Sequence, residues 1–485
     1  MTDKIVPPAS PDAATAAAGA HRFRISRRGL LGAAATLAAA RLLLPGGAFA
    51  AATGAAPEKT DLTIGFIPLT DCAPLVIAHE KGFFKREGLK VTLSKEASWA
   101  NIRDKMTIGA LDAAHMLAGM PIAATLGLGA IPQAQVTALS LDLNGNAITL
   151  SNALHDRMVA ADPAAMAERP MTARALKAVI DADKAAGKAP LTFAAVFPVS
   201  SHMYELRYWL ASAGIDPDAD LRIIVIPPPQ MVANLRAGNC DGYCVGEPWN
   251  ERAVEAGIGK VAITSVELWA NQPEKVLGVA ADWAEKNPAT HEAMLRAVIA
   301  AGQWLDDPAN RAEAADIIAG RAYVNAPAEV VRMSMTGTFR YAADEAPRPL
   351  PDFNVFSRYA ANFPWISHAE WTLTQMIRWG QIDRPVDIAA TAAAVYRPDL
   401  YRRVAAQMGI AAPTIDRKPE GVNTSAWTLT EATRPIAMGP DVFFDGTRFD
   451  PADPVGYIRR FAIKAPAVDL TALAAAQTTP RASAA

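Results

Sequence analysis

Four polar side chains occur where one predicted element gives way to the next. Trp99 follows a strand, Asn146 lies in a Gly-Asn turn, His202 starts a helix after a Phe-Pro turn, and Lys275 lies in the segment Gln272–Gly278. Taken singly, each has a structural explanation: an indole that covers a core, a turn amide, a helix cap and a solvated ammonium. Taken together, they supply an indole N–H, an amide, an imidazole and an ammonium, the donors that hold a small planar oxyanion.

The predicted positions of these side chains favour a common site. In α/β sheets, ligands collect outside the carboxyl ends of the strands. Helix N-termini at the same edge present free N–H groups to anions. We therefore expect a ligand-binding site at the strand ends rather than four unrelated surface positions.

Motifs typical of enzymes are incomplete in this sequence. Gly187-Lys188 and Gly259-Lys260 lack the Gly-rich spacing and the Ser or Thr of a phosphate-binding loop, and Pro132 replaces the last Gly of a dinucleotide-type motif. His291-Glu292 lacks the second His of a zinc-protease helix. With no nucleophile–base pair or metal-ligand cluster in the sequence, we predict a protein that is not an enzyme and that uses no cofactor and no metal.

The sequence contains three cysteines, too few for a disulfide scaffold. Cys240 and Cys244 could form a local disulfide after export, but that bond would be strained, and two buried thiols explain the pair equally well. Cys72 has no partner in either case.

Strands and helices alternate in the first part of the chain, which indicates an α/β fold with a largely parallel sheet. The predicted strands are 62–68, 88–93 and 110–116, and the predicted helices are 73–87 and 101–108.

The same plan recurs in a second unit, with strands at 191–196, 221–226 and 241–245 and helices at 203–214 and 230–237. Two such lobes form a cleft between them, which is a common place for a ligand. We divide the chain into a first lobe (60–150), a second lobe (151–266), a return to the first lobe (267–350) and a C-terminal extension packed on the lobes (351–485). In the extension, Phe443–Asp450 is typical of a hairpin with Asp-Gly at its turn.

The charge of the chain is unevenly distributed. The 485 residues include 47 basic and 49 acidic side chains, a net charge of −2, and 51% of the residues are hydrophobic, as in a globular protein. Residues 1–50 hold six of the basic and two of the acidic side chains, which leaves 41 basic and 47 acidic residues, a net −6, in the remaining 435. An acidic body does not favour nucleic-acid binding.

The basic N-terminus has the three parts of an export signal. Arg27-Arg28 precedes an apolar run that ends at Ala40, and Ala48-Phe49-Ala50 follows as a small-residue cleavage site. Paired arginines are typical of the twin-arginine variant. We therefore predict a twin-arginine signal peptide over residues 1–50 and a mature protein that begins near Ala51. Beyond this leader, the sequence has no uninterrupted apolar run long enough for a membrane helix.

The sequence resembles the periplasmic nitrate-binding proteins of ABC-type nitrate transporters and their relatives that bind bicarbonate. The resemblance extends from about Leu62 to Lys464. It rests on blocks that occur in the same order: Ile64–Leu75, Gly82–Phe84, Asn144–Ser151, Phe197-Pro198 with His202, Gly246–Asn250, Pro273–Gly278 and Phe443–Gly446.

This resemblance implies a two-lobed periplasmic-binding-protein type II fold with a long C-terminal extension. It also implies that Trp99, His202 and Lys275 are similar to groups that contact nitrate. The nitrate binders usually have Gln where this chain has Asn146. The bicarbonate binders have an acidic group in place of Lys275 and use calcium, so Lys275 favours direct charge pairing with an anion and no metal.

We therefore expect a periplasmic solute-binding protein, exported by the twin-arginine route, that captures nitrate or nitrite between its lobes. It would act as a monomer, deliver the anion to an ABC transporter permease and lie at the inner membrane through that transporter. Two alternatives within the family remain open. One is a carrier of another small anion such as bicarbonate, and the other is a nitrate-sensing cytoplasmic regulator, although the leader argues against the regulator.

Overall fold

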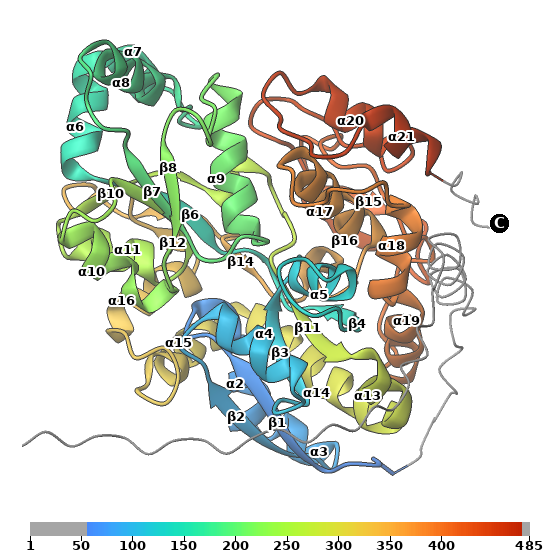
Figure 1. Ribbon diagram of the computed structural model, residues 1–485. Coiled ribbons are helices and arrows are strands. Elements are labelled where there is room, and N and C mark those ends of the chain that lie inside the picture. Colours follow the sequence, from blue (N-terminus) through green and yellow to red (C-terminus); the bar gives the residue numbers. More distant parts are fainter. Residues whose placement is uncertain (1–55, 478–485) are drawn as a thin grey trace, which may run out of the picture. The chain divides into compact units, whose positions relative to one another are not determined.

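The computed structural model describes residues 56–477, so the predicted signal peptide over residues 1–50 lies outside the described residues. Two five-stranded sheets with covering helices form the framework of this region (Figure 1). Within the described range, no helix combines the length and the apolar composition that a membrane crossing requires.

Sheet 1 has the strand order β2-β1-β3-β11-β4. Strand β1 is parallel to β2 and β3, whereas β11 is antiparallel to β3 and β4. The strands are β1 (Asp61–Phe66), β2 (Lys90–Lys95), β3 (Ala113–Leu117), β4 (Gln135–Ser140) and β11 (Lys275–Ala280). The helices of this part are α2 (Ala73–Glu80), α3 (Phe83–Arg86), α4 (Trp99–Thr107), α5 (Met120–Leu126), α13 (Ala281–Lys286), α14 (Pro288–Asp306), α15 (Arg311–Ala319) and α16 (Ala328–Met335).

Sheet 2 has the strand order β10-β6-β9-β7-β8. Strand β7 is parallel to β8 and β9, and β6 is antiparallel to β9 and β10. The strands are β6 (Asn146–Ser151), β7 (Thr192–Ala195), β8 (Arg222–Val225), β9 (Gly242–Gly246) and β10 (Gly259–Thr264). The helices are α6 (Asn152–Ala161), α7 (Pro163–Ala167), α8 (Arg174–Ala185), α9 (Ser201–Ser212), α10 (Met231–Arg236), α11 (Trp249–Glu255) and α12 (Ser265–Leu268).

The alternation of strands and helices is confirmed, and so is a largely parallel sheet, because four of the five strands in each sheet run in the same direction. Each sheet is mixed because strands that return after a crossing between the sheets, β11 in sheet 1 and β6 in sheet 2, run against their neighbours. Sheet 2 also begins at Asn146, a few residues before the lobe boundary expected at residue 150, because β6 pairs with β9 and β10. The predicted helix over 73–87 is two helices, since Gly82 adopts the left-handed conformation (φ 70°) and ends the first.

Hydrogen bonds to backbone carbonyls join residues that follow strands of the two sheets. The Thr70 N–H, just after β1, donates to the carbonyl of Glu247, which follows β9 (2.8 Å). The Trp249 indole N–H donates to the carbonyl of Pro68 (3.2 Å). Side chains that follow β1 and β9 are therefore close to one another, although the two strands belong to different sheets.

Residues after about 350 form helices and short paired strands rather than a third large sheet. All 13 residues of α17 are buried, which places this helix inside the fold rather than on its surface. The elements are α17 (Ile366–Arg378), α18 (Ile388–Val395), α19 (Pro398–Gln407), α20 (Pro454–Arg460) and α21 (Leu470–Ala475), with β15 (Trp427–Leu429) antiparallel to β16 (Ile436–Met438). Short pairs also join β5 (Leu143–Asn144) to β14 (Asn354–Val355) and β12 (Thr338–Phe339) to β13 (Arg348–Pro349).

The hairpin predicted at Phe443–Asp450 is wrong, although its turn is present. The Gly446 N–H donates to the Phe443 carbonyl (3.0 Å), as expected for a turn. The flanking residues do not pair with each other, because Phe443 bridges to Trp269 and Phe449 bridges to Glu420. The extension is thereby joined to the segment between α12 and β11.

Cys240 and Cys244 are free thiols, and both are buried, so the alternative of two buried thiols holds. Cys72 is also free and buried. Burial raises the pKa of the Cys240 thiol to about 11, which keeps this group protonated and unreactive near neutral pH.

We expect Phe443→Ala to weaken the attachment of the extension. The Phe443 ring is stacked on Trp269, with the centroids 4.6 Å apart and the planes inclined by 18°, and it is buried. Truncation should lower the free energy of unfolding by about 3–5 kcal/mol, as for other buried aromatic side chains. Urea denaturation provides the measurement. The neighbouring, half-buried Phe444→Ala is the matched control and should cost less than half as much; equal losses would contradict the assigned contact.

Candidate functional site

The ammonium of Lys275 lies at the start of β11 and is fully buried. Its Nζ donates to Asp71 Oδ2 (2.7 Å) and to the carboxylate of Glu274. Burial lowers the pKa of Lys275, but these two carboxylates outweigh burial and raise that pKa above its ordinary value. Lys275 is therefore a buried cation held by two carboxylates.

Asp71 links this cation to a buried imidazole. Its Oδ1 lies 2.9 Å from His115 Nε2, which projects from the neighbouring strand β3. Burial raises the pKa of Asp71, but Lys275 and His115 together outweigh burial, so the pKa stays well below its usual range and the carboxyl is charged. Burial lowers the pKa of His115, so the imidazole is neutral near pH 7 despite its carboxylate neighbour.

His202 lies in the first turn of α9, where Ser200 caps the helix by accepting from the Met203 N–H (3.0 Å). The ring is fully buried, and neither ring nitrogen has a hydrogen-bond partner. Nε2 lies 3.4 Å from Glu274 Oε1. Burial lowers the pKa of His202 to about 4 against the raising effect of Glu274, so the free site holds a neutral imidazole at pH 7.

Trp99 is the first residue of α4, where Ser98 accepts from the Asn101 N–H (3.2 Å) as the cap. The indole is 1% exposed, yet its Nε1–H has no acceptor. Its ring lies 5.6 Å from Lys275 Nζ and 5.3 Å from the His115 ring, measured to the ring centroids. A buried donor without a partner costs free energy, which a bound acceptor would recover.

Asn146 is the first residue of β6, and its amide is already engaged. Nδ2 donates to Glu205 Oε1 (2.7 Å), whereas Oδ1 is buried without a partner. Gln272 Nε2 donates to the same Glu205 oxygen (2.6 Å). A Cβ atom added at Gly246 would lie 3.3 Å from Asn146 Oδ1 and 3.5 Å from Asp71 Oδ2, so Asn146 lies next to the Lys275–Asp71 pair.

The structure thus brings all four side chains singled out in the sequence to one buried polar region. We call it the polar centre and define it by Asp71, Trp99, His115, Asp142, Asn146, His202, Glu205, Gln272, Glu274 and Lys275. Its residues come from η1 (Thr70–Cys72), α4, β3, β6, α9 and β11 and from the segments before β5 and β11. Among residues 56–477, no group of three or more His, Cys, Asp or Glu side chains has the arrangement of a metal site.

The acidic members of the polar centre were not among the residues predicted from the sequence. Asp71 lies in the block Ile64–Leu75 and Glu274 in the block Pro273–Gly278, both of which carry the family resemblance. The position of Glu274 directly before Lys275 is a local signal from which a charge pair could have been predicted. Asp142 accepts from the Lys275 backbone N–H (3.0 Å), and its pKa is raised well above the ordinary value, mainly by burial. No local pattern marks Asp142 or Glu205 as members of the site.

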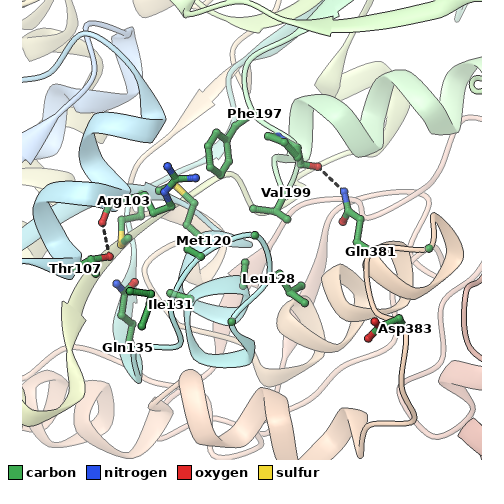
Figure 2. Close-up of a pocket in the computed structure, with 18 of the residues that line it drawn as sticks. Arg103, Thr107, Met120, Leu128, Ile131, Gln135, Phe197, Val199, Gln381 and Asp383 are labelled. Atoms are coloured by element: carbon green, nitrogen blue, oxygen red, sulfur yellow. Dashed lines mark hydrogen bonds between the residues drawn. The ribbon is translucent and has the colours of Figure 1, made fainter. Parts of the chain in front are cut away.

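A separate cavity of about 540 Å³ is mostly apolar. Figure 2 shows its lining, with Met120 and Leu128 on one side, Phe197 and Val199 from the loop before α9, and Gln381 after α17. The Gln381 side chain donates to the carbonyl of Pro198 (2.7 Å) and joins the extension to that loop. None of the four residues predicted to bind the anion lines this cavity.

A family model described as the NMT1-like family matches residues 55–319, more than half of the chain. The chain belongs to this family. The nitrate/nitrite binding protein NrtA of Synechococcus elongatus is a relative of this NMT1-like chain, 38% identical over 421 residues that cover 85% of the chain and 88% of NrtA. The nitrate import ATP-binding protein NrtC of Synechocystis sp. is 41% identical over 408 residues, but this chain spans only 56% of its length.

A solved structure also matches this NMT1-like protein. The crystal structure of the periplasmic nitrate-binding protein NrtA from Synechocystis PCC 6803 superposes with a TM-score of 0.74 at 33% identity and covers 84% of the chain and 100% of that structure. The predicted family and the two-lobed periplasmic-binding-protein fold are therefore confirmed.

We expect Glu205→Gln to reduce the pH dependence of stability. Burial, and next the negative charge of Glu274, raise the pKa of Glu205 to about 8. Between about pH 4.5 and that value, the folded protein holds a proton that the unfolded chain has released, so stability falls as pH rises. A glutamine removes this contribution. Urea denaturation at several pH values should therefore give a shallower decline for Glu205→Gln than for the wild type.

The exposed carboxyl of Glu285 provides the control for this measurement. Glu285→Gln should give a curve parallel to that of the wild type. If Glu205→Gln also gave a parallel curve, Glu205 would not have the raised pKa that its burial indicates.

Proposed function

We propose that this protein is a solute-binding protein that captures nitrate or nitrite in the polar centre and delivers it to the permease of an ABC transporter. The observation that carries the proposal is the meeting of two unpartnered buried groups, the Trp99 indole N–H and the His202 imidazole, near the ammonium of Lys275. NrtA of Synechococcus elongatus, which is named a nitrate/nitrite binding protein, supports it as a relative matched over 88% of its own length.

The chemistry of these groups fits a small anion. A buried anion is tolerated only when it is paired and hydrogen-bonded. Lys275 has three N–H donors, of which Asp71 and Glu274 take two, and the third is available for a ligand. Trp99 and His202 add directional donors. We assign charge pairing to Lys275 and hydrogen bonding to Trp99 and His202.

Asn146 has a different role in this proposal. Because its N–H group is bonded to Glu205, the side chain turns its free Oδ1 toward the region next to Asp71. A carbonyl oxygen repels an anion, so we assign Asn146 to the orientation of Glu205 at the edge of the site.

The lobes close on the ligand by a hinge movement in this proposal. We place the first lobe at 60–145, the second at 146–266, the return to the first lobe at 267–350 and the extension at 351–485, with the boundary at 145 moved to agree with the strand pairing of β6. The two crossings, at 141–145 and in the segment from α12 to β11, are the natural hinges. The protein acts as a monomeric carrier without catalytic activity.

We also propose that the carrier works in the periplasm after export by the twin-arginine route and lies at the inner membrane through its transporter. Two observations support this location: the Arg27-Arg28 motif of the leader, and the similarity of the chain to the periplasmic nitrate-binding protein NrtA of Synechocystis. Cell fractionation separates it from the alternative of a cytoplasmic nitrate-sensing regulator.

Lys275→Glu should abolish nitrate binding, because it replaces the buried cation with a further carboxylate. His202→Ala should weaken binding by about tenfold to a hundredfold, the expected loss of a hydrogen bond to a charged group. Isothermal titration calorimetry with nitrate is the measurement. Lys260→Glu, a half-buried position on β10 outside the polar centre, is the control and should bind as the wild type does.

Titration of the wild type against nitrate, nitrite and bicarbonate, with and without calcium, completes this test. Wild-type nitrate affinity in Lys275→Glu would contradict the assigned site. Tight bicarbonate binding that requires calcium would favour the alternative carrier.

A further inference from the structure

The polar centre contains more acidic groups than a site for an anion is expected to have. Four carboxyl groups, those of Asp71, Asp142, Glu205 and Glu274, are buried there with one cation, Lys275. In a region without solvent, charges of equal sign repel strongly because little screens them. An incoming anion therefore needs more positive charge than Lys275 alone provides.

The two carboxylates that contact the Lys275 ammonium already neutralise its positive charge. Asp71 and Glu274 both accept from Nζ. Burial raises the pKa of Asp142 well above its ordinary value and that of Glu205 to about 8, which favours the protonated form of both groups. With one ammonium and two carboxylates, the free site has a net negative charge, and an anion would bring a further negative charge.

His202 is the member of the polar centre that can add a positive charge by taking up a proton. Its Nε2 lies 3.4 Å from Glu274 Oε1, and its Nδ1 is buried without a hydrogen-bond partner. A neutral imidazole has one N–H and one lone pair, whereas an imidazolium has two N–H donors. If an anion occupies the Nδ1 side, a neutral ring turns its lone pair toward one of two negative groups, and only the protonated ring donates to both.

We propose that the polar centre binds its anion together with one proton, which His202 holds between the anion and Glu274. This inference rests on the proposed function and specifies what the site takes up. Nitrate itself takes up no proton near neutral pH, so any proton consumed on binding goes to the protein.

The surroundings of His202 set the direction of the effect. Glu274 and Asp71 favour the imidazolium, whereas burial, Lys275 and His115 oppose it, and they hold the pKa of the free ring at about 4. Glu205 lies one turn further along α9. The bound anion adds a negative charge and raises the pKa of the ring, so nitrate affinity rises as pH falls toward about 4 and declines as pH increases.

The test is calorimetry of the mature chain with sodium nitrate, in buffers of different ionisation enthalpy, between about pH 5.5 and 7.5. We expect the uptake of about one proton per nitrate and an affinity that falls up to about tenfold per pH unit as pH rises. His202→Gln introduces an amide, which can donate a hydrogen bond but cannot take up a proton. This variant should therefore bind nitrate more weakly and without proton uptake. Glu274→Gln removes the carboxylate that favours the imidazolium and should reduce the uptake.

His368→Gln is the matched control, because His368 is also buried and also lies beside a glutamate, Glu420 (3.1 Å), but outside the polar centre. The His368→Gln variant should take up as many protons per nitrate bound as the wild type does. Nitrate binding without proton uptake in the wild type, or uptake that persists in His202→Gln, would overturn this inference and leave the proposed function standing. Absence of nitrate binding by the wild type at every pH would overturn both.

Discussion

The site depends on the buried ion pair of Lys275 with Asp71 and Glu274. Removing an ammonium and carboxylates from water is costly, and only close pairing offsets that cost. Lys275 begins β11 of sheet 1, Asp71 follows β1 and touches His115 on β3, and Glu274 approaches His202 on α9. One set of charges therefore connects the ends of strands in sheet 1 with the first turn of a helix that covers sheet 2. The positions of Trp99 and His202 relative to the cation follow from this connection.

The same interaction explains why the overall charge of the chain is a poor guide to its ligand. The body is acidic and its buried centre contains more carboxyl groups than cations, yet the unpartnered groups around Lys275 include an indole N–H and an imidazole. Selection of the ligand is a local matter of geometry and protonation. The separate, mostly apolar cavity is lined by neither of these two unpartnered groups.

Local patterns in the sequence predicted the named strands and helices of the two units to within a few residues, apart from the break at Gly82, because hydrophobic periodicity and capping residues such as Ser98 and Ser200 act over short distances. They did not predict the one reversed strand in each sheet, β11 and β6, since the pattern of a buried strand does not record the direction of its neighbour. The hairpin at Phe443 was wrong for a similar reason: its Asp-Gly turn is local, but its pairing partners, Trp269 and Glu420, are distant in sequence.

The candidate site shows the same division. Trp99, His202 and Lys275 could be selected as donors from their residue types and positions, and the structure places them together; their contact with a ligand remains a prediction. Asp71, which lies 204 residues from Lys275 in the chain, could not be paired with it from local sequence. The protonation of Glu205 and His202 depends on burial and on each neighbouring charge, which only the folded structure supplies.

The most direct test of the central claim is a crystal structure of the mature protein with nitrate bound. We expect a planar anion within hydrogen-bonding distance of Trp99 Nε1, a ring nitrogen of His202 and Lys275 Nζ. Nitrate bound in the apolar cavity between Met120 and Phe197, with the Lys275–Asp71–Glu274 cluster unoccupied, would contradict it.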